Sequence, residues 1–264
     1  MNDVSKIRKF KQVGTRPARP DGDDKVTGRA LYGADTVAPG MLMAAVLRSP
    51  HAHAQIVSID FSAALAHDGV KAVVTGADLV AQDEGSLRDI QENCLATTRV
   101  LYDGHAVAAV AALTLKAAQE ALKLIKVEYS ALPHVIEVDD AMRADAPIVQ
   151  SGRALENVPP GFSQNVTYHC QFGHGDTDVG FALADEIVTR SFKTAATHQG
   201  YIEPHACLAQ MTTDGKAELW CCTQGQYNVR DICSALLGLE GSQLRVTASE
   251  IGGGFGGKTN VFIE

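Results

Sequence analysis

The sequence predicts an α+β fold made of two successive units. Short β-type runs outnumber the helical segments, and the clearest helix stands between two strands. A proline-containing connector, residues 141–165, separates a first unit at 22–140 from a second unit at 166–264. Residues 1–21 are polar and basic and then rich in Pro and Asp, which indicates an extended N-terminal arm continuing to about residue 24.

Composition places the chain among ordinary globular proteins. It has 264 residues and a mass of 28.0 kDa, with 45% hydrophobic and 20% charged residues. The net charge of −8 argues against nucleic acid as a partner. No apolar run approaches the roughly 20 residues of a membrane span. The basic N-terminus has no apolar run behind it and so is not a secretory signal, which predicts a cytoplasmic protein.

The cysteines predict no metal framework. They stand at positions 94, 170, 207, 221, 222 and 233, and none forms the spaced pair typical of zinc or iron–sulfur sites. We therefore expect buried or half-buried thiols in a reducing cytoplasm.

Local signals place the elements of the first unit. Strand-like runs flank Ser49-Pro50 in 41–59, and 70–76 is a compact strand. Asp103-Gly104 stands between two apolar runs in 99–112 and predicts a hairpin. Thr114 is the expected N-cap of a helix at 115–125, and strand character resumes after it. The expected buried stripe of that helix is Leu115, Ala118, Ala121, Leu122 and Ile125.

The second unit has equally clear signals. Asp176 is the expected N-cap of a short helix. Asp214-Gly215 predicts the turn of a hairpin spanning 207–222. A helix follows at 228–238 and ends at Gly238, with Val229, Ile232, Ala235 and Leu236 on one face. Residues 244–251 then form a strand that leads into the glycine-rich run 252–259, GGGFGGKT.

The glycine run allows several interpretations. Gly252, Gly257, Lys258 and Thr259 fit the P-loop pattern, and Gly252, Gly254 and Gly257 fit the dinucleotide-binding fingerprint. The sequence beyond the run lacks the helix and acidic residue that these motifs need. A tight glycine corner without a ligand is a further possibility. Glycines also let successive backbone N–H groups approach an anion or the oxo ligands of a metal centre.

The same run carries a resemblance to a known family. Thr223-Gln224 precedes it, with Gln224 31 positions before Phe255 (255 − 224 = 31). Together they resemble the molybdenum-cofactor subunit of the xanthine dehydrogenase/aldehyde oxidase family. The segments DGDDKVTGRALYGAD, LRSPHAHAQIVSID, VLYDGHAVAAVAALTLKAAQEALKLIKVEY and HQGYIEPHACLAQ agree with this, in the family's order. The resemblance implies an α/β hammerhead domain at 22–140. It also implies the first, incomplete part of a molybdopterin-binding α+β domain at 166–264.

The resemblance also implies roles for individual residues. Gln224 would approach the apical oxo ligand of molybdenum, and Gly254, Phe255 and Gly256 would cradle the cofactor through their backbone. Thr259 stands where purine-oxidising members have a Glu, so it is a candidate for the substrate pocket. A purine substrate is therefore disfavoured, whereas aldehydes, N-heterocycles and aryl compounds remain open.

Other residues fit the family less directly. The general-base Glu is expected beyond this chain, so neither Glu203 nor Glu264 takes that role. Molybdenum is held by the pterin, so no side chain is a direct metal ligand. Zinc at His51 and His53, or at His198, Glu203 and His205, is the weaker alternative.

The resulting function is a share in an oxidoreductase. The family hydroxylates a carbon with oxygen from water, using molybdopterin, here in the cytosine dinucleotide form. The expected partners are a second polypeptide that completes the molybdenum subunit, a 2Fe-2S iron–sulfur subunit, an FAD subunit and a small-molecule substrate. Because the pattern stops inside a new element, the alternative is a truncated remnant without activity. A P-loop-type nucleotide binder is the remote alternative.

Overall fold

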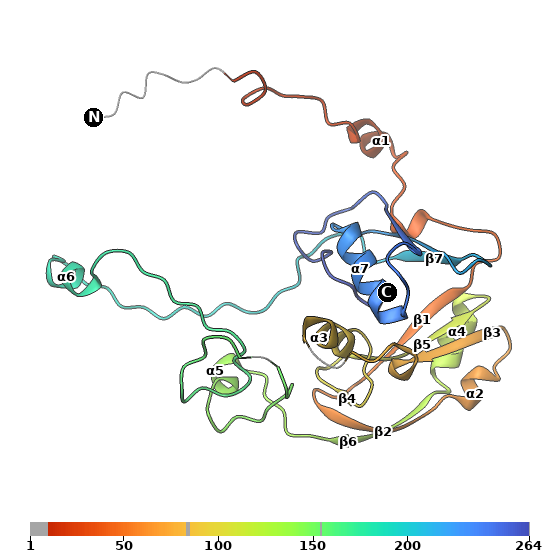
Figure 1. The fold of residues 1–264 in the computed structure, drawn as a ribbon, viewed down its shortest axis with the longest axis horizontal. Helices are drawn as coiled ribbons and strands as arrows, with labels where there is room; N and C mark the ends of the chain where they lie inside the picture. The colour runs from red at the N-terminus through yellow and green to blue at the C-terminus, as the bar shows by residue number, and fades with distance from the viewer. Residues whose placement is uncertain (1–9, 83–84, 154, 264) are drawn as a thin grey trace.

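The computed structural model describes residues 10–82, 85–153 and 155–263 (Figure 1). The predictions for the first nine residues of the arm and for Glu264 concern residues outside these ranges. The described chain forms three sheets of three strands each, accompanied by short helices. No helix in the described ranges combines the length and the apolar character that crossing a membrane needs.

The first sheet is antiparallel, in the order β1-β5-β3. Its strands are β1 (Met43–Arg48), β5 (Ala106–Ala112) and β3 (Val70–Thr75). Helix α4 (Leu115–Leu122) packs on it, and Thr114 caps the helix by accepting a hydrogen bond from the N–H of Ala117, as predicted. Ala118, Ala121 and Ile125 from the expected stripe are buried, whereas Leu115 is exposed. The short helix α2 (Ser62–Leu65) adds the buried Ala64 to this core.

The second sheet is also antiparallel, in the order β4-β2-β6. It contains β4 (Arg99–Val100), β2 (Ala54–Asp60) and β6 (Lys126–Ala131). Val107 of β5 is buried against Ala54 and Val100, while Ala108 and Val110 lie in the core under α4. Strand β5 is therefore covered on both faces, because its alternate side chains enter two different cores.

The predicted hairpin at Asp103-Gly104 is wrong in its pairing. Gly104 does make a turn, with φ of 83°, but β4 pairs with β2 whereas β5 pairs with β1 and β3. The N–H of Gly104 donates to the carbonyl of Ser49, and the N–H of Ser49 donates to the carbonyl of His105. These bonds align β5 with β1, so the turn carries the chain from one sheet to another.

Two helices of the structure were not predicted from the sequence. Helix α1 (Gly22–Thr27) begins within the segment predicted to be extended, because Asp23 and Asp24 suit the first turn of a helix. Helix α3 (Gly85–Cys94) was not expected, since most of its residues are polar. The amide of Gln91 is buried and bonds the N–H of Gln82 and the carbonyl of Val80, which fixes this helix to the chain before it. The remaining short elements there are η1 (Gly33–Asp35), η2 (Gly76–Asp78) and α5 (Val138–Ala141).

The third sheet belongs to the second unit, in the order β7-β8-β9. The hairpin of β7 (Cys207–Met211) and β8 (Ala217–Cys221) is confirmed, with Gly215 at φ of 80° in its turn. Strand β9 (Leu244–Ala248) runs parallel to β8, and α7 (Gln226–Leu237) connects them. Helix α7 ends at Gly238 in the left-handed conformation, as predicted. Val229, Ile232 and Leu236 face the core, and Ala235 is half-buried.

The N-terminal segment packs against this third sheet. Lys25 forms an ion pair of 2.5 Å with Glu250, and Tyr32 forms a β-bridge with the same residue. The N–H of Val80 donates to the carbonyl of Leu236 in α7 at 2.9 Å. Residues before β1 thus lie beside residues near the end of the described chain (Figure 1).

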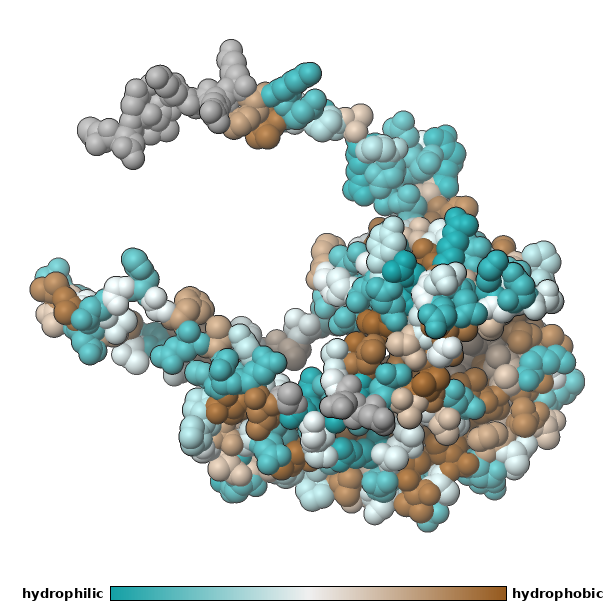
Figure 2. Space-filling view, in the orientation of Figure 1, coloured by the Kyte–Doolittle hydropathy of each residue, from teal (hydrophilic) through white to brown (hydrophobic). Residues whose placement is uncertain are grey.

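A long exposed segment lies in the second unit, before its sheet. Between Cys170 and Gly200 every residue is exposed, and the only regular element is α6 (Thr177–Ala182), capped by Asp176 as predicted. The segment nevertheless carries large apolar side chains, with Phe172 94% and Phe192 90% exposed. Figure 2 shows apolar atoms at the tip of this protruding segment.

Buried His105 predicts a pH-dependent stability. Its ring is fully buried, stacks on Tyr102 at 4.4 Å, and accepts the N–H of Leu101 at Nδ1. Burial lowers the pKa of His105 below its ordinary value, and the nearby carbonyls of Glu92 and Asn93 oppose this only in part. Below about pH 6.5 the unfolded chain therefore binds a proton that the folded chain does not. We expect the free energy of unfolding to decrease as the pH is lowered, by up to about 1.4 kcal/mol per pH unit for this group.

Urea unfolding between about pH 7.5 and pH 5.5 measures this effect. His105→Gln keeps a hydrogen-bond acceptor but does not titrate, so its pH slope should be smaller than that of the unmodified chain. His174→Gln, on the exposed segment, is the matched control and should leave the slope unchanged. Equal slopes for both variants would contradict the assignment to His105.

Candidate functional site

The glycine loop, Gly252–Thr259, follows β9 and bends sharply. Gly253, Phe255 and Gly256 have φ of 100°, 48° and 85°. The N–H of Gly257 donates to the carbonyl of Gly254 at 2.7 Å, which closes a turn around Phe255. A bulky residue at positive φ is uncommon, so the surrounding contacts must hold Phe255 in place. Its ring is 73% exposed.

Gln224 is bound to this loop through one end of its amide. Its Oε1 accepts the N–H of Gly256 at 3.1 Å and the N–H of Lys258 at 3.2 Å. Its own backbone N–H donates to the carbonyl of Lys258 at 2.8 Å. A Cβ at Gly254 would overlap the Gln224 amide, so a glycine is required there. Because Oε1 is engaged, the amide nitrogen is the end left to donate a hydrogen bond to a ligand.

Polar side chains near β8 and α7 hold the far end of the loop. Thr223 donates to the carbonyl of Lys258 at 3.2 Å, and Asn228 donates to the carbonyl of Thr259 at 2.8 Å. The hydroxyl of Thr259 donates to the carbonyl of Gly256 at 2.9 Å. Thr259 is exposed, and its hydroxyl supports the loop itself. Its role toward a substrate stays a prediction.

A buried ion pair lies behind the loop. Lys258 Nζ is 2.6 Å from Glu203 Oε2, and the two side chains are 0% and 9% exposed. Glu203 also accepts the N–H of Gly252 at 2.7 Å and the N–H of Gly33 at 3.1 Å. Burial, the largest single effect, opposes ionisation of Glu203, but the bonds from Lys258, Gly252 and Gly33 together lower its pKa. The carboxylate therefore joins the loop to η1.

This ion pair bears on the P-loop interpretation of the glycine run and on the role of Glu203. A P-loop lysine must reach the phosphates of a nucleotide, whereas the ammonium of Lys258 is fully buried on Glu203. The arrangement is not that of a P-loop. Glu203 is occupied by Lys258 and two backbone N–H groups. That the general base lies elsewhere stays a prediction.

The histidines have other partners than a metal. His53 Nδ1 is 2.7 Å from the carbonyl of Pro133, and the ring of His51 contacts that of Tyr129. The hydroxyl of Tyr201 lies between His198 and His205, at 3.0 and 2.7 Å from their Nε2 atoms. Within the described ranges, no three His, Cys, Asp or Glu side chains gather closely enough to hold a metal ion.

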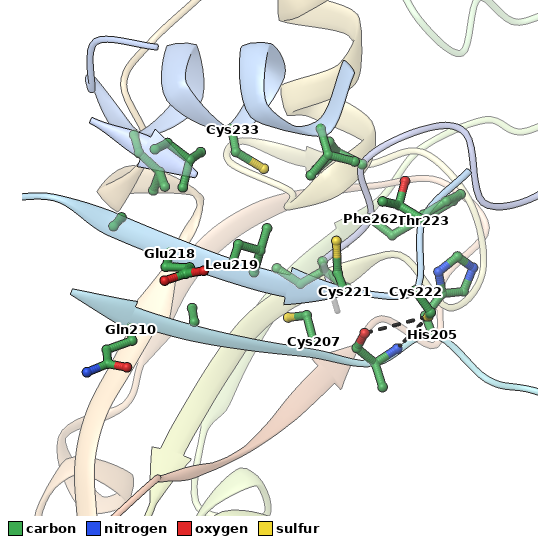
Figure 3. Close-up of a pocket in the computed structure, with 18 of the residues that line it drawn as sticks. His205, Cys207, Gln210, Glu218, Leu219, Cys221, Cys222, Thr223, Cys233 and Phe262 are labelled. Atoms are coloured by element: carbon green, nitrogen blue, oxygen red, sulfur yellow. Dashed lines mark hydrogen bonds between the residues drawn. The ribbon is translucent and has the colours of Figure 1, made fainter. Parts of the chain in front are cut away.

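A mostly apolar cavity of about 350 Å³ lies between the β7-β8 hairpin and α7, next to the loop (Figure 3). Thr223 and Lys258 line its end nearest the loop, and three thiols project into it from Cys207, Cys221 and Cys233. Burial raises the pKa of Cys221 to about 12 and that of Cys233 to about 11, so both thiols stay neutral near pH 7.

The expected burial of all the cysteines is partly wrong. Cys221 and Cys222 are buried, and Cys94 and Cys233 are half-buried. Cys170 is exposed because it lies on the long exposed segment of the second unit, and Cys207 is exposed on the edge strand β7.

The loop offers hydrogen-bond donors to a ligand. Among the described residues, the N–H groups of Gly253, Gly254 and Phe255 donate to no protein acceptor. Together with the amide nitrogen of Gln224, they are donors left for a ligand, and none of these groups carries a charge; we call this set the cradle. Such a set suits anionic or strongly polar acceptor atoms on a large cofactor. The molybdopterin cofactor that the sequence resemblance implies is therefore compatible with these residues.

The fold and this cradle define a cofactor-binding part of an oxidoreductase. The family model "Aldehyde oxidase and xanthine dehydrogenase, a/b hammerhead domain" matches residues 27–133, and the model "Molybdopterin cofactor-binding domain" matches residues 158–264. The chain belongs to the xanthine dehydrogenase/aldehyde oxidase family, as part of its molybdenum-cofactor-binding subunit.

Individual relatives agree with this. The nicotinate dehydrogenase large molybdopterin subunit of Eubacterium barkeri is 31% identical over 97% of this chain and 57% of its own length. The carbon monoxide dehydrogenase large chain of Afipia carboxidovorans is 31% identical over 98% of this chain and 33% of its own length. The solved quinoline 2-oxidoreductase of Pseudomonas putida 86 superimposes with a TM-score of 0.71 at 29% identity, over 95% of this chain and 32% of that one. The chain thus spans between a third and somewhat more than half of these relatives.

The sequence analysis missed two features of the site. It treated Lys258 only as a P-loop lysine and gave Tyr201 no role. The available signal was the number of glycines in the loop. A glycine is needed where another residue occupies the space of a Cβ, as at Gly252, Gly253, Gly254 and Gly257. Apart from Gln224, the neighbours from outside the loop come from residues 199–203, far away in the sequence, so only the fold identifies them.

Proposed function

We propose that this chain supplies one side of the cofactor site of a molybdenum hydroxylase. The observation that carries the proposal is the arrangement of Gln224. Its amide oxygen is held by Gly256 and Lys258, which directs the amide nitrogen toward a ligand as a neutral donor. Gly254 and Phe255 would contact the same ligand through their backbone N–H groups. The N–H and carbonyl of Gly256 already bond Gln224 and Thr259, so Gly256 would contribute only a close approach of its backbone.

Bound molybdopterin would supply the two-electron oxidation that lets a substrate carbon be hydroxylated with oxygen from water. The chain's own residues would bind and orient this group. Thr259 at the end of the loop offers no carboxylate, so we propose an aldehyde, N-heterocycle or aryl substrate rather than a purine. We also propose the cytosine dinucleotide form of the cofactor, which the family resemblance favours.

The remaining parts of the enzyme would come from elsewhere. The general-base Glu and most of the pterin site are proposed to lie on a second polypeptide. A 2Fe-2S subunit and an FAD subunit would carry the electrons onward, in the cytoplasm. In this proposal, residues 1–21 are an arm, 22–140 the hammerhead domain, 141–165 a connector and 166–264 the first part of the cofactor domain. The large-subunit names of the relatives support an assembly of several chains.

Native mass spectrometry of the protein purified from its own host tests this proposal. We expect a complex well above 28.0 kDa that releases a second large polypeptide, a molybdopterin nucleotide and redox-cofactor subunits. A bare monomer or homo-oligomer without molybdenum would refute the proposal and would favour the truncated remnant.

A further inference from the structure

We propose that Tyr201 is a positioning residue that sets the conformation of the glycine loop, and through it the orientation of Gln224. The inference rests on the proposed function, because it concerns the same cofactor cradle. It is carried by the contacts of Tyr201 with both ends of the loop, which neither the sequence motifs nor the family match assigns.

The side chain of Tyr201 lies against two glycines, with its Cβ near Gly253 and its ring near Gly257. A Cβ at Gly253 would be 3.0 Å from Tyr201 Cβ, and a Cβ at Gly257 would be 2.8 Å from Tyr201 Cε1. At Gly257 this distance is shorter than real Cβ atoms show, and Gln199 Cδ at 2.9 Å adds to the restriction. At Gly253 the contact is tight, and the φ of 100° favours glycine as well. The Tyr201 side chain therefore contacts the loop on either side of Phe255.

The ion pair behind the loop also contacts this ring. Lys258 Nζ lies 4.8 Å from the ring centroid of Tyr201 while it bonds Glu203. A buried ammonium above an aromatic face is attracted by the ring quadrupole. Tyr201 thus contacts residue 253 near the start of the loop and residues 257 and 258 at its end.

The hydroxyl of Tyr201 is held by a directed chain of hydrogen bonds. The N–H of Gly200 donates to His198 Nδ1 at 3.1 Å, so neutral His198 carries its proton on Nε2. That N–H donates to the Tyr201 hydroxyl at 3.0 Å, and the hydroxyl donates to His205 Nε2 at 2.7 Å. Rotation of the ring away from the loop would break two hydrogen bonds. The ring is therefore fixed from the side opposite the loop.

The link from Tyr201 to Gln224 runs through Gly257. The two N–H groups that hold Gln224 Oε1 belong to the residues on either side of Gly257, which are Gly256 and Lys258. A shift of Gly257 toward space vacated by Tyr201 would move both donors. Gln224 would then lose the contacts that direct its amide nitrogen, and the cradle would lose its preorganised shape.

The test measures molybdenum per chain in the assembled complex, together with the Mo(V) electron paramagnetic resonance signal. Tyr201→Ala should lower the molybdenum content about tenfold, the change that a loss of 1.4 kcal/mol produces. Tyr201→Phe keeps the ring against Gly257 and should restore the content to within about twofold of that of the unmodified complex. The control Tyr129→Ala removes a half-buried ring from the hammerhead unit and should leave molybdenum bound.

Gly257→Ala examines the same contact without removing a side chain, in case Tyr201→Ala does not fold. Its new Cβ would press on the Tyr201 ring and on the end of the Gln199 side chain, so it should also lower the molybdenum content and alter the Mo(V) signal. The inference is overturned if Gly257→Ala keeps both the content and the signal, or if Tyr129→Ala loses as much molybdenum as Tyr201→Ala. An unmodified complex without molybdopterin would instead overturn the proposed function.

Discussion

Replacement of Lys258 by methionine is expected to destabilise the fold by about 3–5 kcal/mol, the usual result of removing one partner of a buried ion pair. The variant leaves Glu203, which is 9% exposed, with two backbone N–H groups as its remaining partners. Methionine fills a similar volume, so the loss reflects the uncompensated charge rather than a cavity. Urea unfolding monitored through Trp220 measures the effect, since this residue lies on β8 beside the loop region.

Two comparisons isolate the charge. The double variant Glu203→Gln/Lys258→Met removes both charges. The N–H groups of Gly252 and Gly33 bond different carboxylate oxygens, so Gln can still accept one of them and should regain part of the lost stability. Lys216→Met removes an exposed lysine and should change stability by less than about 0.5 kcal/mol. A double variant no more stable than Lys258→Met would mean that the charge itself is not the cause.

The pH dependence of the same pair has a definite sign. The pKa of Glu203 in the folded chain lies below its unfolded value, so its contribution is present above about pH 4.3 and is lost as pH falls through the folded pKa. In Lys258→Met the buried carboxylate has lost its cation, and protonation should relieve the penalty. The stability difference between the two proteins should therefore shrink toward low pH.

Gln224→Ala in the assembled enzyme should lower turnover by about 10²-fold, the typical cost of one preorganised donor. Gln224→Glu is the sharper variant, because a carboxylate can still accept the N–H groups of Gly256 and Lys258 but has no N–H to donate. It should retain the cofactor and still lose turnover. Steady-state kinetics, normalised to bound molybdenum, separate the two effects.

The control for these variants is Gln210→Ala, which alters an exposed glutamine on β7. It should retain full turnover. Unchanged turnover per molybdenum in both Gln224 variants would remove Gln224 from the site, whatever the fate of the loop.

Local chemistry made many elements of this fold predictable. Thr114 and Asp176 cap helices, Gly238 ends one, and Asp214-Gly215 turns a hairpin, because each signal acts within a few residues. Asp103-Gly104 gives the same local signal but a different result. Its neighbours pair with other strands because Ser49, far away in the sequence, bonds the turn.

The site was predictable in part for the same reason. The pairing of Gln224 with the glycine run follows from a motif with a fixed spacing, and the structure brings these residues together. Sequence reasoning could not identify which amide atom faces the loop, or that Glu203 neutralises Lys258 from 55 positions away. Both depend on the tertiary fold, which brings Glu203 from before β7 and Gln224 from after β8 to the loop that follows β9.

The exposed segment between Cys170 and Gly200 determines how the chain should respond to proteolysis. It is the natural place for a protease to cut, since its backbone is accessible and its one helix has six residues. A cut there would not free the two pieces at once, because Lys25 still bonds Glu250, Val80 still bonds Leu236, and Gly33 still bonds Glu203. The nicked chain would stay together as a complementing pair of fragments. This part of the fold therefore tolerates division of the polypeptide without losing its assembly.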